Sequence, residues 1–178
     1  MKVATKIVVL IVLLSLGASA RKRDPLTEAE SDELRQVAME PYKRIKLLIK
    51  FTEARLTAID QVRVDSKAKD RGKQIHDLLE DFTSLVDEIN DNLDQFEGRQ
   101  MAKDSLKEYH KGLKELVEAD ERFDLKLKAL QTASETDPQT KKDFPDFRFA
   151  LQDAQESVKS SAEVAREYSE TTHEEKKK

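Results

Sequence analysis

Residues 75–96 of the chain have the sequence IHDLLEDFTSLVDEINDNLDQF. Apolar side chains recur in it at alternating spacings of four and three residues: Ile75, Leu79, Phe82, Val86, Ile89, Leu93 and Phe96. This is the period of an α-helix with one apolar face, and such a face is stable in water only when other elements cover it. The stretch therefore predicts an all-α protein in which helices pack side by side.

Three other segments repeat this spacing and are predicted to supply the partner helices. The first series is Leu34, Ala38, Pro41, Ile45, Leu48, Thr52, Arg55, Ile59 and Val62. The third is Ala102, Leu106, Tyr109, Leu113, Leu116, Asp120, Phe123, Leu127 and Leu130. The fourth is Phe147, Leu151, Ala154, Val158, Ser161, Ala165 and Tyr168. The predicted helices cover about 28–63, 66–97, 100–131 and 145–170.

Four amphipathic segments of similar length predict an antiparallel up-down-up-down four-helix bundle over residues 27–170. Short links between the first three segments should make consecutive helices antiparallel neighbours. Two alternatives remain: a three-helix core with the fourth segment packed loosely on it, and an extended coiled-coil dimer. Four glycines and four prolines in 178 residues do not suit a β-protein, which needs many turns.

Several residues predict where these helices begin and end. Thr27 and Glu30 have the spacing of a capping box at the start of the first helix. Pro41 lacks an amide hydrogen, so we expect a kink or a new helix there. The polar residues 132–143, which include Asp137 and Pro138, predict a loop.

The fourth helix and the C-terminal tail have their own signals. Pro145 is expected at a first helical position and opens the fourth helix. Residues 171–178 lose the apolar period and predict a disordered charged tail.

The first 20 residues have the build of a secretory signal peptide. Lys2 and Lys6 precede an apolar run at 7–16, and small residues follow at 18–20. The sequence therefore predicts cleavage between Ala20 and Arg21 and export to the periplasm or the medium. An uncleaved N-terminal anchor and a short propeptide processed at the basic residues 21–23 are the alternatives, because positive charge here disfavours translocation.

The composition restricts the partners of the mature chain. Removal of residues 1–20 takes away two lysines and no acid, which moves the net charge from −4 to −6. This acidity argues against nucleic acid, whose phosphates require a basic surface.

The chain has no cysteine, which excludes disulfides. After the short basic segment 21–26 no apolar run reaches the roughly 20 residues of a membrane-spanning helix. We expect a protein or envelope component as partner; the oligomeric state stays open.

The second helix carries a row of acidic residues with no basic residue among them, namely Asp77, Glu80, Asp81, Asp87, Glu88, Asp91 and Asp94. One interpretation is an interaction face for a basic partner or for divalent cations. The other is structural: folding the helices back on each other places Arg44 near Asp87 on one side and Lys107 near Asp91 on the other. Such charges select neighbouring helices and their register.

Two charged residues, Arg55 and Asp120, occupy apolar-series positions, and His76 is expected at the same height of the bundle. We predict a polar core layer in which Arg55 and Asp120 pair across the bundle. Such a layer fixes the register of helices at a cost in stability. A small internal site for an anion or a proton-linked ligand is the functional alternative, with His76 as the titrating group.

The residues needed for common bundle cofactors are sparse. The three histidines are His76, His110 and His173, and covalent haem needs a cysteine pair that the chain lacks. The single Glu-x-x-His at 170–173 falls short of a di-iron site, which takes that motif from two helices. There is no nucleophile motif, phosphate loop or zinc spacing. We therefore predict a non-enzymatic protein without a cofactor and with a binding or structural role; the alternative is a bundle that carries haem or a divalent metal.

Overall fold

The computed structural model describes residues 23–96 and 103–175. Within these residues every regular element is an α-helix, which confirms the all-α fold class. The helices are α2 (Glu28–Gln36), α3 (Pro41–Val64), α4 (Arg71–Phe96), α5 (Lys103–Thr136) and α6 (Pro138–Glu175). The predicted signal peptide and its cleavage site at Ala20 and Arg21 lie outside the described residues. No helix in the described ranges combines the length and the apolar character needed to cross a membrane.

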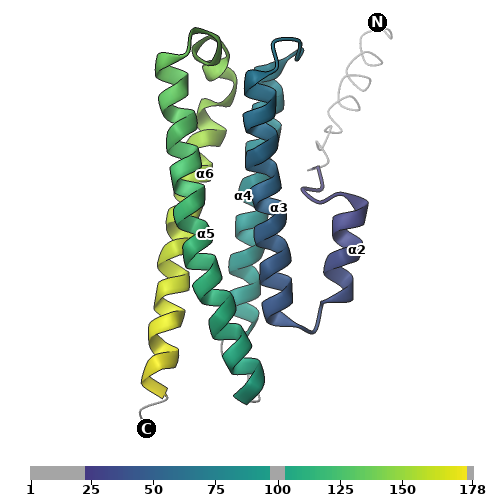
Figure 1. The fold of residues 1–178 in the computed structure, drawn as a ribbon, viewed down its shortest axis with the longest axis vertical. Coiled ribbons are helices and arrows are strands. Elements are labelled where there is room, and N and C mark those ends of the chain that lie inside the picture. The colour runs from purple at the N-terminus through teal and green to yellow at the C-terminus, as the bar shows by residue number, and fades with distance from the viewer. Residues whose placement is uncertain (1–22, 97–102, 176–178) are drawn as a thin grey trace, which may run out of the picture.

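The four long helices pack as a bundle, and α2 lies beside α3 at its edge (Figure 1). Extended interfaces join α3 to α4, α4 to α6, α6 to α5 and α5 to α3. The helices therefore occupy four corners, with α4 and α5 at opposite ones. Cross-helix contacts show the relative directions: Tyr42 meets Glu115 and Asp60 meets Lys126, so α3 and α5 are parallel. Arg44 meets Glu88 and Arg55 meets Asp81, so α3 and α4 are antiparallel.

The prediction that the second and third helices are neighbours is wrong, since α4 and α5 form no extended interface in the described part of the chain. A short link does not by itself force two helices to be neighbours. Six residues separate α4 from α5, and an extended link of that length can span about 20 Å. The diagonal of a four-helix bundle is shorter, because neighbouring axes lie only about 10 Å apart.

The first predicted helix is two helices, with the break at Pro41. Proline stands at the first position of α3, where its missing amide hydrogen costs nothing. The capping box before α2 is confirmed: the Glu30 amide donates to Thr27 Oγ1 at 3.2 Å, and the Thr27 amide donates to Glu30 Oε2 at 2.8 Å. Leu34 is the buried residue of α2, which packs against α3.

The loop predicted at residues 132–143 is wrong, because α5 continues to Thr136 and α6 begins at Pro138. Asp137 and Pro138 act as a helix start: the Asp137 carboxylate accepts a hydrogen bond from the Thr140 amide at 2.8 Å, and proline takes the first position. Pro145 consequently lies inside α6 and does not begin it.

Two more predicted boundaries move. The second helix begins at Arg71 and not near residue 66, because the Asp65 side chain accepts from the Lys67 amide and Asp70 adopts a left-handed φ of 49°. The tail predicted as disordered from residue 171 is wrong over its first part, since α6 extends to Glu175. Residues 176–178 lie outside the described residues.

Most of the core consists of residues that the apolar series identify, although Ala38 of the first series is exposed and Phe51 and Leu85 are buried outside the series. Ile75, Leu79, Phe82, Val86, Ile89 and Leu93 of α4 are all 0% exposed. Tyr109, Leu113, Leu116, Phe123 and Leu127 of α5 and Phe147, Leu151, Ala154, Val158 and Ala165 of α6 are also buried. The rings of Phe82 and Phe123 meet edge to face across the bundle, with centroids 5.5 Å apart. Burial of these faces stabilises the fold by about 25 cal/mol for each Å² removed from water.

Candidate functional site

The acidic residues of α4 divide into two groups by what they contact. Toward the end of the helix, Glu88 pairs with Arg44 of α3 at 2.6 Å, and Arg44 also donates to Asn92. Asp94 accepts from Tyr168 of α6 at 2.6 Å. The sequence predicts that the basic residue Arg44 of α3 lies near Asp87 of α4. In the structure Arg44 pairs with Glu88, the next residue along α4. This group joins the helices together.

The corresponding prediction for the third helix is wrong, because α5 lies diagonally from α4. Lys111 of α5, one turn after Lys107, lies over the Tyr42 ring of α3 at 4.8 Å from its centroid. The helix beside α4 is α6, and Ser157 of α6 donates to Asp87 at 3.1 Å. The flank of the acidic row that faces α6 therefore does not meet the basic residues of α5 that the structural interpretation required.

A groove of about 620 Å³ runs along this flank between α4 and α6. We call it the acidic groove; its lining includes five carboxylates, Asp77, Glu80, Asp81, Asp87 and Asp153, and two basic residues, Arg23 and Lys73. A second hollow of about 550 Å³ continues past Glu88 and Asp91 and shares Arg23, Ser84 and Asp87 with the groove. Acidic residues outnumber basic residues in the walls of both hollows.

Arg23, which precedes α2, lies in the acidic groove. One of its terminal nitrogens, Nη2, donates to the main-chain oxygen of Asp77 at 2.9 Å and to Asp81 Oδ2 at 2.6 Å. The hydrogen bond to Asp81 raises the pKa of the Arg23 guanidinium above its usual value. The Arg23 side chain is 57% exposed, whereas the Asp81 side chain is only 14% exposed.

The predicted polar layer of Arg55, His76 and Asp120 does not form. Arg55 binds Glu30 of α2 through two hydrogen bonds of 2.9 and 2.6 Å and also donates to the Pro25 carbonyl at 2.7 Å. These bonds to Arg55 lower the pKa of Glu30 to about 2. The prediction failed because α2, formed by the break at Pro41, folds back onto α3 and covers Arg55.

Asp120 is buried, as its position in the apolar series predicts, but its partner is Ser161 of α6. Ser161 Oγ donates to Asp120 Oδ2 at 3.1 Å, and among the described residues Oδ1 has no hydrogen-bond partner. Burial raises the pKa of Asp120 to about 7, against the smaller opposing effects of Ser161 and Arg166. The carboxyl group is therefore partly protonated near neutral pH.

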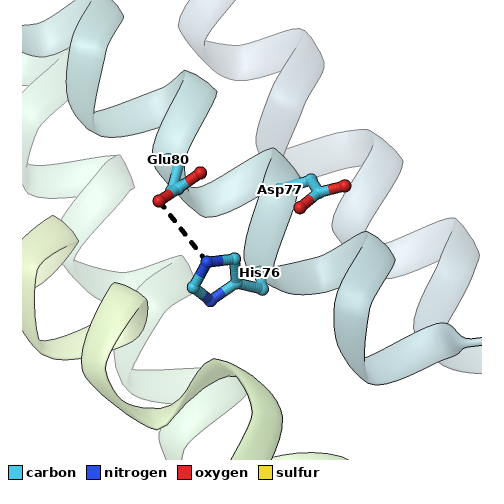
Figure 2. Close-up of side chains that lie close together, drawn as sticks. All are labelled: His76, Asp77 and Glu80. Carbon is cyan, nitrogen blue, oxygen red and sulfur yellow. Dashed lines mark ion pairs between the residues drawn. The ribbon is translucent and has the colours of Figure 1, made fainter. Parts of the chain in front are cut away.

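His76 lies at the surface of α4, one turn before Glu80. Figure 2 shows Glu80 turned toward the imidazole ring. The His76 Nε2 and Glu80 Oε1 atoms are 3.4 Å apart. The ligand atoms of His76, Asp77 and Glu80 lie within 4.8 Å of one another, a donor set suited to a divalent cation such as Zn²⁺. Asp77, however, already pairs with Lys73 at 2.7 Å. A cation would have to displace that ammonium group, and we assign the cluster to the surface charges of α4.

The sequence did not indicate three charged residues of the acidic groove: Arg23, Lys73 and Asp153. Arg23 belongs to the basic segment 21–26, but nothing in the sequence indicates that this segment lies against α4. Asp153 is one of many charged residues on the fourth helix, and its placement depends on α6 being a neighbour of α4.

Comparisons of the chain with protein-family models, with curated proteins and with solved structures find no match.

Proposed function

We propose that this protein is exported and non-enzymatic, and that its acidic groove binds a basic segment of a protein or envelope partner. Export is inferred from residues 1–20, with cleavage between Ala20 and Arg21. The scaffold in this proposal is the up-down-up-down bundle of α3 to α6, with α2 as an addition. The observation that carries the proposal is the lining of the groove, in which five carboxylates face two basic residues.

Charge complementarity supports a basic partner. Carboxylates gathered along one groove produce a negative potential that attracts cations and speeds their association. Among the described residues, Asp87 and Asp153 are the groove carboxylates without a basic partner, since Asp77 pairs with Lys73, Asp81 with Arg23 and Glu80 with His76. The α5 side of the bundle differs, because acids such as Glu53 and Asp60 are paired there with Arg122 and Lys126.

Fluorescence anisotropy of a labelled hexa-arginine peptide tests the proposal on the protein purified after export. We expect the Asp87→Asn/Asp153→Asn double variant to bind about three- to tenfold more weakly, because each exposed charge contributes modestly. Asparagine keeps the acceptor that Asp87 offers to Ser157, so the helix contact is retained.

The matched control is Glu118→Gln/Asp124→Asn, which removes two exposed acids of α5 outside the groove. Binding should weaken at higher salt for every variant. If the groove variant and the control bind the peptide equally, the proposal is wrong.

The alternative of a bundle that carries a cofactor or metal makes a different prediction. Protein purified from its own host would contain metal or haem at a fixed stoichiometry, and metal analysis and absorbance spectra would detect it. Loss of metal in a His76→Ala variant would favour this alternative over the binding of a basic segment.

A further inference from the structure

We propose that Arg23 is an internal ligand of the acidic groove, and that the external partner is an arginine-bearing segment that displaces it. The inference rests on the proposed function and specifies the partner of the same groove. Arg23 lies before α2 and reaches Asp77 and Asp81, more than fifty residues later in the chain. It therefore approaches the groove as a separate segment would.

The contacts of Arg23 define the chemistry that the groove recognises. Its guanidinium faces three oxygens: the Asp77 carbonyl at 2.9 Å, Asp81 Oδ2 at 2.6 Å and Asp77 Oδ2 at 3.9 Å. A planar guanidinium presents several N–H donors in a fixed fork and bridges such acceptors at little cost in rotamer freedom. A lysine ammonium is a compact, strongly hydrated charge and matches this arrangement less well. The groove should therefore prefer arginine to lysine.

Neighbouring residues hold Arg23 close to the groove. The Pro25 carbonyl accepts a hydrogen bond from Arg55 at 2.7 Å, and the Asp24 carboxylate accepts one from the Leu26 amide at 2.9 Å. A tethered group acts at a high effective concentration, so Arg23 competes with a free segment even when each contact is weak. The Arg23 side chain is 57% exposed, and exposed ion pairs are weak. We therefore expect Arg23 to lower the apparent affinity of the groove for a free segment by no more than about fivefold.

The position of Arg23 also separates two binding spaces. It lines both the groove of about 620 Å³ and the adjoining hollow of about 550 Å³, together with Ser84 and Asp87. An extended segment that ran along α4 through both spaces would meet the Arg23 side chain. Displacement of Arg23 would let such a segment reach Asp81 and Asp91 at once.

The test compares the affinities of hexa-arginine and hexa-lysine for the wild-type protein, Arg23→Ala and Arg35→Ala. Arg35 pairs with Asp32 on α2, outside the groove, so Arg35→Ala is a control with the same change in net charge. We expect Arg23→Ala to bind hexa-arginine about three- to fivefold more tightly than Arg35→Ala does. Hexa-arginine should bind more tightly than hexa-lysine to every variant.

Three results would each contradict a different part of the proposal. Equal affinities for Arg23→Ala and Arg35→Ala would overturn the competition by Arg23 and leave the proposed function standing. Equal binding of the two peptides would overturn the preference for arginine. No binding of either peptide to any variant would overturn the proposed function itself.

A peptide-free measurement tests the occupancy of the groove by Arg23. Trypsin must bind the guanidinium to cleave after Arg23, so a seated side chain protects that bond. We expect Asp81→Asn to speed this cleavage severalfold, because it removes the charged acceptor at 2.6 Å. The control is Asp124→Asn on α5. Equal cleavage rates in the two variants would overturn the occupancy.

Discussion

Ser161 of α6 donates a hydrogen bond of 3.1 Å to Asp120 of α5, and both side chains are removed from water at 0% and 1% exposure. One carboxyl oxygen, Oδ1, has no partner in the described part of the structure. A buried carboxylate with a single neutral donor is costly, whereas the protonated carboxyl is tolerated. The contact therefore couples the packing of α5 and α6 to pH.

Asp120→Asn should remove a pH dependence of stability. The pKa of Asp120 is raised from 3.8 to about 7 in the folded state, so the folded protein binds a proton that the unfolded chain loses. The stabilisation is fully present below about pH 4, declines as pH rises toward about 7, and is absent above that. A pKa raised from 3.8 to about 7 corresponds to a loss of about 2–4 kcal/mol in the free energy of unfolding.

Urea unfolding of wild type and Asp120→Asn between pH 4 and 8 measures this difference. We expect the advantage of the asparagine variant to grow from pH 4 to 7 and then to level off. Asp124→Asn, an exposed acid one turn later on α5, is the control and should show no such growth. Parallel stability curves for wild type and Asp120→Asn would contradict the prediction.

Glu30→Gln should release α2 from α3. The pair of Glu30 and Arg55 is largely buried, with side chains 14% and 11% exposed, and its removal leaves the Arg55 charge with only the more distant Asp81 carboxylate at 3.9 Å. We expect a local loss of about 1–3 kcal/mol, detectable as faster hydrogen exchange of residues 28–36 while the bundle stays protected.

The pH dependence of this contact has the opposite sign to that of Asp120. The folded pKa of Glu30 is lowered to about 2 from 4.5, so the stabilisation is present above about pH 4.5 and is lost as pH falls toward 2. Asp32→Asn, which removes an exposed acid of the same helix, is the control. Unchanged exchange of α2 in Glu30→Gln would show that Arg55 does not hold this helix.

Gly72→Ala should destabilise the contact between α4 and α6. A Cβ atom at residue 72 would lie only 2.9 Å from the Cβ of Asp146, closer than two carbon atoms pack. We expect a loss of about 1–3 kcal/mol, because a backbone shift is needed to relieve the overlap. The neighbouring pair of Arg71 and Asp143, with Nε and Oδ2 2.6 Å apart, would be disturbed by such a shift.

Gly112→Ala is the comparison: Gly112 lies inside α5, where alanine improves helix propensity by about 1 kcal/mol, whereas Gly72 lies in the first turn of α4. The new Cβ would lie 3.3 Å from Tyr42 Cδ2, a contact that a small ring movement relieves. Its urea midpoint should stay close to that of wild type. If both variants lose the same stability, the overlap at Asp146 is not the cause.

Asp137→Ala should weaken the start of α6. The Asp137 carboxylate accepts from the amide and the hydroxyl of Thr140, and these bonds lower its pKa. We expect a lower urea midpoint at neutral pH and a smaller difference from wild type at acid pH, because protonation of Asp137 weakens the same cap. Glu135→Ala, a nearby exposed acid on α5, is the control; an equal effect from it would contradict the capping role.

Helix ends could be predicted from the sequence only where the signal is local and has one meaning. Thr27 and Glu30 form the capping box that their spacing indicates, and Pro41 starts a helix. Asp137 and Pro138 have two meanings, a turn or a helix start, and only the helices on either side show which applies.

The candidate site was predicted in part for the same reason. The acidic row of α4 is visible in the sequence, because residues three and four apart lie on one face of a helix. Its division into paired and groove-lining residues was not visible. Glu88 is paired because α3 brings Arg44 to it, whereas Asp87 lines a groove because α6 brings Ser157 and Asp153 to that flank.

The sequence by itself determined that the protein is helical and which residues form most of its core, because the three-four spacing records which face of each helix avoids water. The tertiary structure alone decided which helix covers which face. Apolar faces are interchangeable in composition, so periodicity cannot distinguish α5 from α6 as the neighbour of α4. That choice also decided the polar partners: Asp120 meets Ser161, Arg55 meets Glu30, and Arg23 lies beside Asp81.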